Sequence, residues 1–168
     1  QVIFLMRVGN ADIDIIETLP TTPSFAQFDR RLFSQALTNL IKNAIEGIAA
    51  REEGSNEEAG RVEVKVALHE DWAEVDIIDN GKGFPAMNRQ RLLEPYMTTR
   101  SEGTGLGLPI VAKIIEDHGG RLELLDAPSG KGACVRIILP LAPQEGKTDV
   151  SQEAAVIDNE KMIKRGEA

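Results

Sequence analysis

Three short segments of this 168-residue chain combine polar residues and glycines at spacings that could bind a phosphorylated ligand. The first segment, LTNLIKNAIEG, has the periodicity of a helix, and its Asn39 and Asn43 are four residues apart on one face. Asparagine is a poor helix former, so two of them at the edge of the inward face need partners. Each side chain could bond a neighbouring loop. Alternatively, the amide oxygens could hold a Mg²⁺ ion that already has phosphate ligands.

The second segment is DNGKGFP, residues 79–85, in which an apolar, strand-like run ends in Asp79. A simple turn would explain an acid followed by glycines at the end of a strand. A bound ligand would explain it equally, because Gly81 and Gly83 allow close approach to the backbone. The segment alone leaves both interpretations open.

The third segment, EGTGLGLPIV, carries Gly103, Gly105 and Gly107 just before an apolar helix. Glycines at a helix start expose backbone N–H groups that attract an anion, although a flexible hinge would have the same composition. The spacing fails the dinucleotide fingerprint, because its third glycine comes one position early and a loop precedes it. The GKT at 146–148 is no P-loop, because Leu141 stands where the first glycine is required.

The remaining sequence predicts the elements that must position these segments. Alternation predicts strands, and three-four periodicity predicts helices. The expected strands are 12–17, 61–70, 72–79, 121–127 and 133–141, and the expected helices are 1–10, 30–51 and 106–118, with a short helix near 88–93. Asp29 is the expected N-cap of the first long helix, with Phe28 and Phe33 placed as a hydrophobic staple.

Composition narrows the possible function. Apolar residues make up 42% of the chain and charged residues 27%, as in a globular domain, or one domain plus a polar tail at 143–168. No apolar run is long enough to cross a bilayer, and a single cysteine, Cys134, fits a reducing, cytoplasmic compartment. The net charge of −8 argues against a nucleic-acid partner.

Taken together, the segments NLIKNA, DNGKGFP and GTGLGL resemble, in order and spacing, the N, G1 and G2 boxes of sensor histidine kinases. These kinases share a superfamily with gyrase, Hsp90 and MutL. The stretch LLEPYMTTRSEGTGLGLPIV is especially similar to the nitrogen-regulation branch of NtrY and NtrB type. The resemblance covers roughly residues 12–141. It implies an α/β fold of Bergerat type, a two-layer α+β sandwich whose mixed, mostly antiparallel sheet carries helices on one face and a long ATP lid.

The resemblance also implies a site for ATP and Mg²⁺. Asp79 would accept a hydrogen bond from the exocyclic amine of adenine, and would select ATP over GTP, which offers an acceptor there. Asn43 would be the metal ligand, with Asn39 beside it at the phosphates. The implied nucleotide-binding residues are Asn39, Asn43, Asp79, Gly81, Gly83, Phe84, Thr98, Thr99, Arg100, Gly103, Thr104, Gly105, Leu106, Gly107 and Leu108.

Catalytic roles are implied for Asn39, Asn43 and Arg100, with Arg100 in the lid as the candidate contact of the γ-phosphate. Lys42 is a second basic candidate, but a solvated helix lysine explains it better. Phe84 and Tyr96 are expected either to pack over the nucleotide or to meet a partner domain, as is Met97.

Two departures from the wider superfamily shape the expected activity. ATPases of the superfamily carry a glutamate where this chain has Asn39, and an amide cannot take a proton from water, so ATP hydrolysis should be slow. Relatives often place a threonine at the position of Ala133. If Ala133 faces the adenine pocket, a hydroxyl near Asp79 is lost.

Neither His69 nor His118 lies on a helical hairpin beside an acid, as a phosphate-accepting histidine would, and His118 could be a helix-capping residue. By resemblance, the accepting histidine belongs to an N-terminal dimerisation domain, of whose last helix residues 1–11 are the end. The expected domains are therefore 1–11, an ATP-binding domain at 12–142 and a tail at 143–168. This chain would bind ATP without phosphorylating itself.

The expected partners are that dimerisation domain and the receiver domain of a response regulator. The fragment would be a monomer and the intact kinase a homodimer that could be anchored in the inner membrane. Two alternatives are a serine kinase of anti-sigma type and a nucleotide-sensing or adaptor module that transfers nothing.

Overall fold

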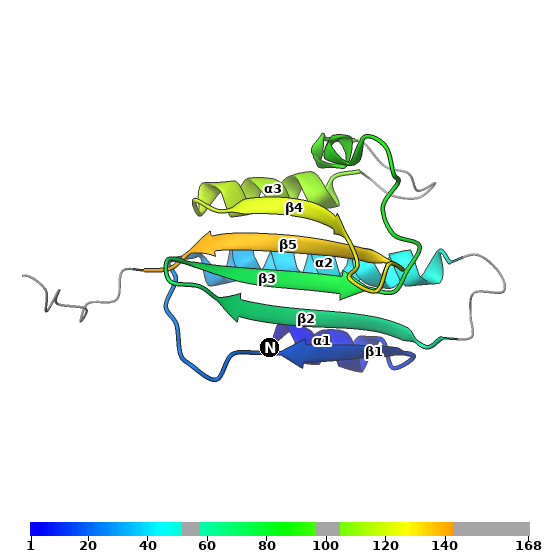
Figure 1. Ribbon diagram of the computed structural model, residues 1–168, viewed down its shortest axis with the longest axis horizontal. Coiled ribbons are helices and arrows are strands. Elements are labelled where there is room, and N and C mark those ends of the chain that lie inside the picture. The colour runs from blue at the N-terminus through cyan, green and yellow to red at the C-terminus, as the bar shows by residue number, and fades with distance from the viewer. Residues whose placement is uncertain (52–57, 97–104, 143–168) are drawn as a thin grey trace, which may run out of the picture.

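The computed structural model describes residues 1–51, 58–96 and 105–142, which form three α-helices, five strands and one 3₁₀ helix (Figure 1). In chain order the elements are α1 (Val2–Gly9), β1 (Ile13–Thr18), α2 (Arg30–Ala49), β2 (Gly60–Leu68), β3 (Trp72–Asp79), η1 (Arg89–Leu93), α3 (Gly107–Asp117), β4 (Arg121–Asp126) and β5 (Ala133–Pro140). Every strand and helix expected within residues 1–142 is therefore confirmed, with small shifts at the ends. The short helix expected near 88–93 is η1, the 3₁₀ helix.

The strands form one mixed sheet in the order β1-β2-β3-β5-β4. β1 runs parallel to β2, and the other neighbouring pairs are antiparallel. A parallel pair needs a long crossover connection, which here contains α2. The expectation of a mixed, mostly antiparallel sheet is confirmed. Because β3 and β5 are antiparallel neighbours, the C-terminal end of β3 lies beside the N-terminal end of β5.

Alternation along the strands separates the two faces of this sheet. On β3, Val75 and Ile77 belong to the buried core, whereas Glu74 and Asp76 point the other way. Helices α2 and α3 contact each other and the strands, and Figure 1 shows α2 running behind the central strands. The core is aliphatic, and its largest fully buried side chains are Leu40, Ile41, Ile77, Ile115, Ile137, Val62 and Val111.

The start of α2 is fixed by the predicted cap. Asp29 Oδ1 accepts hydrogen bonds from the N–H groups of Arg31 (2.8 Å) and Leu32 (3.0 Å). The bonds from Leu32 and Arg31 lower the pKa of the Asp29 carboxyl below its ordinary value of 3.8, because they favour its ionised form. The rings of Phe28 and Phe33 pack with centroids 4.7 Å apart, as expected for a hydrophobic staple.

Helix α1 packs one side on the core through Val2, Ile3 and Met6. Within the described part of the chain, no helix has both the length and the apolar character needed to cross a membrane. The tail expected at 143–168 lies outside the described residues.

Candidate nucleotide-binding site

Asp79, the last residue of β3, is a buried carboxylate, with 7% of its surface exposed. Its Oδ1 accepts hydrogen bonds from the N–H groups of Gly81 (2.8 Å) and Ala133 (3.2 Å). The first donor belongs to the loop that follows β3, and the second to the first residue of β5. Main-chain groups from two segments therefore orient this carboxylate, as a site that reads one edge of a ligand requires.

The loop after Asp79 lies directly on the backbone of α2. A Cβ atom added at Gly81 would come within 2.5 Å of the carbonyl carbon of Gly47, closer than real side chains approach. The N–H of Lys82 donates to the carbonyl oxygen of Gly47 (3.1 Å). The close approach of the loop to α2 therefore requires Gly81 to lack a side chain, for a packing reason that differs from the predicted room for a ligand.

Gly47 was missed by the sequence reasoning, although a glycine inside a long helix was an available signal. Such a glycine weakens the helix relative to alanine and so calls for a packing reason. Its main chain is the surface on which Gly81 rests. A Cβ atom added at Gly47 itself would lie 3.8 Å from Asp79 Oδ1, an ordinary contact distance.

Asn80, the middle residue of DNG, has a structural role. Its Oδ1 accepts from the N–H of Arg61 (2.8 Å) and from the guanidinium of Arg51, and its Nδ2 donates to the carbonyl of Ala59 (2.9 Å). Asn80 therefore ties the end of β3 to β2 and to the end of α2. It holds the scaffold beneath Asp79.

The two asparagines of α2 are half-buried, as expected for the edge of the inward face. Asn43 lies beside the start of α3, because a Cβ atom added at Gly107 would be 3.7 Å from Asn43 Nδ2 and 3.8 Å from its Oδ1. The structure thus brings the first and third polar segments of the sequence together. An amide and the N-terminus of an eleven-residue helix face the same region, which suits an anion or an anion-bound cation.

A main-chain hydrogen bond connects Tyr96 and Gly105, which lie between the G1 box and the end of the G2 box. The N–H of Tyr96 donates to the carbonyl of Gly105 (3.1 Å). Gly105 has a φ of +67°, which favours glycine. The predicted site residues Thr98, Thr99, Arg100, Gly103 and Thr104 lie outside the described residues, as does Met97.

Other candidates from the sequence lie as follows. Phe84 is half-buried and packs against the hydrophobic core, whereas Tyr96 is 77% exposed. Lys42 is exposed on α2, as a solvated lysine would be. Arg89 was not singled out, yet it donates to the carbonyl of Pro85 (3.1 Å) and to Asp126 Oδ1 (2.5 Å). It links the segment after Asp79 to the end of β4.

Ala133 lies on the same face of the sheet as Asp79. The register that pairs Ile78 with Cys134 places Asp79 opposite Ala133, and directly opposed residues share a face. Ala133, the position at which the resemblance implies a threonine, therefore adjoins the Asp79 carboxylate. Cys134 is a buried residue, as expected, and burial raises the pKa of its thiol to about 11.

Both histidines make structural contacts. His118 follows α3, where its Nδ1 bonds the carbonyl of Ile114 (2.6 Å) and its Nε2 accepts from the N–H of Asp29 (2.9 Å). The capping role predicted for His118 is confirmed, and the bond to Asp29 adds a link between α3 and α2. His69 pairs with Glu74 (2.8 Å) and stacks on Trp72.

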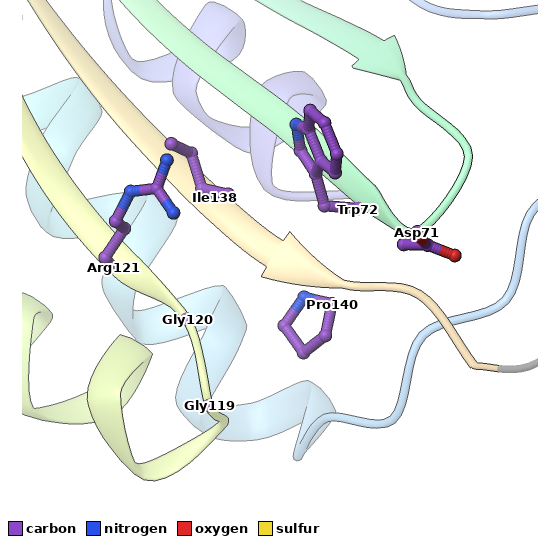
Figure 2. Close-up of a pocket in the computed structure, with 7 residues that line it drawn as sticks. All are labelled: Asp71, Trp72, Gly119, Gly120, Arg121, Ile138 and Pro140. Atoms are coloured by element: carbon purple, nitrogen blue, oxygen red, sulfur yellow. The ribbon is translucent and has the colours of Figure 1, made fainter.

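A hollow of about 360 Å³ lies by the start of β3, the end of β5 and the segment that follows α3 (Figure 2). It is lined by Asp71, Trp72, Gly119, Gly120, Arg121, Ile138 and Pro140. Trp72 begins β3 and Pro140 ends β5, whereas Asp79 and Ala133 occupy the opposite ends of these strands. This hollow is therefore separate from the three polar segments.

Comparison with known proteins shows which family shares this sequence and fold. The family of histidine kinase-, DNA gyrase B- and HSP90-like ATPases matches residues 28–143. The nitrogen regulation protein NtrY of Azorhizobium caulinodans is 49% identical over 155 residues, covering 92% of this chain and 20% of that protein. The solved mycobacterial sensor histidine kinase MprB superposes with a TM-score of 0.70 at 28% identity, covering 85% of this chain and 91% of the other. Full-length ShkA in complex with AMPPNP superposes with a TM-score of 0.68 at 26% identity, covering 84% and 29%.

The chain belongs to the family of histidine kinase-, DNA gyrase B- and HSP90-like ATPases. Within it, fold and sequence define an ATP-binding catalytic domain of the sensor histidine kinase class, similar to that of NtrY. The chain spans about a fifth of the length of the curated relatives NtrY and the kinase AtoS of Escherichia coli.

Proposed function

We propose that this domain serves a two-component sensor histidine kinase by transferring the γ-phosphoryl group of ATP to a histidine on a separate dimerisation domain. The observation that carries the proposal is the buried Asp79 carboxylate, held by main-chain N–H groups at one end of the sheet. Asp79 lies at the C-terminal end of β3, where the loop that contains Gly81 begins. Its partner in the proposal is Asn43, beside the start of α3.

Each end of the site has a distinct task in this proposal. Asp79 accepts the hydrogen bond of the adenine amine, and the main chain of Gly81 and Gly83 contacts the ring. The missing side chains of these two glycines admit Gly47 and Gly132 on the other side. The phosphates are bound by Asn39 and by the backbone N–H groups of four consecutive residues, Gly105, Leu106, Gly107 and Leu108. Phe84 supports the loop beneath the ring from the core side.

The amide oxygen of Asn43 suits a Mg²⁺ ion that also has phosphate ligands, and such an ion would neutralise charge on the transferring group. Arg100 is proposed as the γ-phosphate contact, and Thr98, Thr99, Gly103 and Thr104 as further lid contacts, by their positions in the sequence motif. Because Asn39 stands where an ATPase carries a water-activating carboxylate, the domain holds ATP with little hydrolysis.

The rest of the assembly follows from the same proposal. Residues 1–11 continue a helix of the dimerisation domain, 12–142 are the catalytic domain and 143–168 are a polar extension. The intact kinase is a homodimer of the cytoplasm or inner membrane, and its phosphorylated histidine serves the receiver domain of a response regulator.

Calorimetric titration with ADP and with AMPPNP, with and without Mg²⁺, tests the nucleotide site. We expect the unsubstituted chain to bind both nucleotides, and to bind AMPPNP more strongly with Mg²⁺. Asp79→Asn should lose about a hundredfold or more in affinity. Its amide oxygen would keep the main-chain N–H donors, so its NH₂ group would face the adenine amine, a donor against a donor. Asp76→Asn is the matched control, since Asp76 is a buried acid of the same strand (8% exposed) that binds Arg136 on the other face. Equal binding by Asp79→Asn and the unsubstituted chain would contradict the proposed site.

Transfer of the γ-phosphoryl group to a dimerisation domain needs a separate test. A dimerisation domain of NtrY type, expressed on its own, should acquire label from γ-labelled ATP when this chain is added, and should not when Asp79→Asn is added. Nucleotide binding without any labelling would instead favour a nucleotide-sensing or adaptor module.

A further inference from the structure

The turn between β4 and β5, residues 127–132, reaches the carboxylate that the proposed function assigns to adenine. The turn is closed by hydrogen bonds from the N–H of Ala127 to the carbonyl of Gly132 (3.2 Å) and from the N–H of Gly130 to the carbonyl of Ala127 (2.8 Å). It ends one residue before Ala133, whose N–H donates to Asp79 Oδ1. None of the sequence motifs includes this turn.

Two glycines of the turn have similar backbones but different surroundings. Gly130 has a φ of +77° and Gly132 a φ of +98°. A Cβ atom added at Gly130 would meet nothing within 4 Å. One added at Gly132 would lie 1.9 Å from the carbonyl oxygen of Asp79 and 2.8 Å from the Cα of Asn80. The main chain of Gly132 therefore lies directly against the main chain of Asp79.

The contact continues on both sides of Gly132. A Cβ atom added at Gly83 would lie 3.0 Å from the carbonyl oxygen of Gly132, so the loop after β3 also rests on the turn. The other support of this loop is α2, where Gly81 rests on Gly47. Asp79 and its loop are thus held between α2 and the β4–β5 turn, in contacts that leave no room for side chains.

We propose that Gly132 is a positioning residue that sets the orientation of Asp79 and, through it, the preference of the site for adenine; this inference rests on the proposed function. A side chain at 132 pushes the turn away from Asp79 and breaks the bond from the Ala133 N–H to Asp79 Oδ1, so one of the hydrogen bonds that orient the carboxylate is lost. Directional hydrogen bonds weaken steeply with misalignment, so a rotated carboxylate no longer distinguishes an amine from a carbonyl. The phosphate contacts proposed on α2 and α3 belong to other elements and remain.

The test compares Gly132→Ala with Gly130→Ala in the full chain. Both substitutions strain a backbone of positive φ, but only the first adds a methyl against Asp79. The measurement is the affinity for ADP and for inosine diphosphate, which has a carbonyl in place of the amine. We expect the unsubstituted chain and Gly130→Ala to prefer ADP by about tenfold or more, and Gly132→Ala to bind the two within about threefold.

The outcomes separate the inference from the proposed function. If the unsubstituted chain does not prefer ADP, the role of Asp79 in the proposed function fails and the inference fails with it. If it does, but Gly132→Ala keeps the preference or weakens both ligands equally, Gly132 does not position the carboxylate and the inference alone is overturned.

A second measurement needs no variant at 132 and covers the case in which Gly132→Ala does not fold. Hydrogen exchange of the Ala133 amide in the free, unsubstituted chain should be slow, because Asp79 already accepts its bond, and should become faster in Asp79→Ala. Rapid exchange of that amide in the unsubstituted chain would overturn the inference.

Discussion

The two ends of the nucleotide site are built in different ways. At the base end, main-chain groups of three segments meet around Asp79, and glycines make the contacts: Gly81 on Gly47, and Gly132 on Asp79 itself. At the phosphate end, the described contributors are the half-buried amides of α2 and the start of α3. The base end therefore depends on glycines, which allow close main-chain contacts around the Asp79 carboxylate, whereas the described part of the phosphate end consists of side-chain amides and the start of a helix.

This difference predicts that the two ends of the site respond to different kinds of substitution. Adding a methyl group should be the disruptive change at the base end, because a close-packed main-chain contact cannot absorb it. Removing polar atoms should be the disruptive change at the phosphate end, because those atoms are the ligands. Changes at the capping contacts between α2 and α3, away from both ends, should alter stability without altering nucleotide binding.

Apart from Gly132→Ala, the largest effect is expected for Gly81→Ala. The new methyl would lie 2.5 Å from the Gly47 carbonyl carbon, so the loop after Asp79 must shift as a whole. We expect a free energy of unfolding lower by about 2 kcal/mol and ADP binding too weak to detect. Urea unfolding and calorimetry measure the two effects.

Gly47→Ala is the matched control from the other side of the same contact. Its methyl would lie 3.8 Å from Asp79 Oδ1 and clashes with nothing, and alanine favours a helix interior by about 0.5–1 kcal/mol over glycine. The free energy of unfolding should therefore stay level or rise. An equal loss of stability in both variants would break the distinction between the two glycines.

A smaller effect is expected at the phosphate end for Asn43→Ala. This variant should bind ADP without Mg²⁺ to within about twofold of the unsubstituted chain, and should lose the Mg²⁺-dependent gain in AMPPNP affinity, about tenfold. Thr38→Ala is a control on the same helix, because the Thr38 hydroxyl donates to the Ser34 carbonyl one turn earlier (2.8 Å). A Mg²⁺-dependent gain that survives in Asn43→Ala would remove Asn43 as the metal ligand.

The contact between the helices gives a third, still smaller effect. His118→Ala removes the hydrogen bonds to the Ile114 carbonyl and from the Asp29 N–H, so we expect the free energy of unfolding to fall by about 1 kcal/mol. ADP affinity should be unchanged, since His118 lies at the end of α3 remote from Gly107. A parallel loss of affinity would mean that the packing of α3 on α2 also controls the phosphate end.

Sequence reasoning recovered the helices and strands of the described residues, whereas the roles of the motif residues stay predictions. Alternation located β1 to β5, and Asp29 with its apolar neighbours located the start of α2. It did not recover Gly47 or Gly132, because their importance comes from contacts between distant segments. The bond between Ala133 and Asp79 joins residues 54 apart, and the bond between His118 and Asp29 joins residues 89 apart. Such contacts depend on strand order and helix packing, which local pattern does not specify.

The smallest effect is expected for the Asp29 N-cap of α2. It distinguishes stabilisation by the carboxylate charge from stabilisation by the hydrogen bonds alone. The hydrogen bonds from the Leu32 and Arg31 N–H groups lower the pKa of Asp29 below 3.8, and the charge of Arg31 lowers it by a smaller amount. A lowered folded-state pKa means that the stabilisation is fully present above the unfolded value and disappears as the pH falls through the folded value.

Asp29→Asn keeps a good N-cap acceptor but cannot titrate. The two chains should therefore have similar melting temperatures at pH 7, and the melting temperature of the unsubstituted chain should fall further below pH 3.8, where other carboxyl groups affect both chains alike. The measurement is the difference between the two melting temperatures from pH 7 down to pH 2.5. A difference that does not change with pH would mean that the cap acts through hydrogen-bond geometry alone. ADP affinity at pH 7 should be the same in both, because the cap lies outside both ends of the nucleotide site.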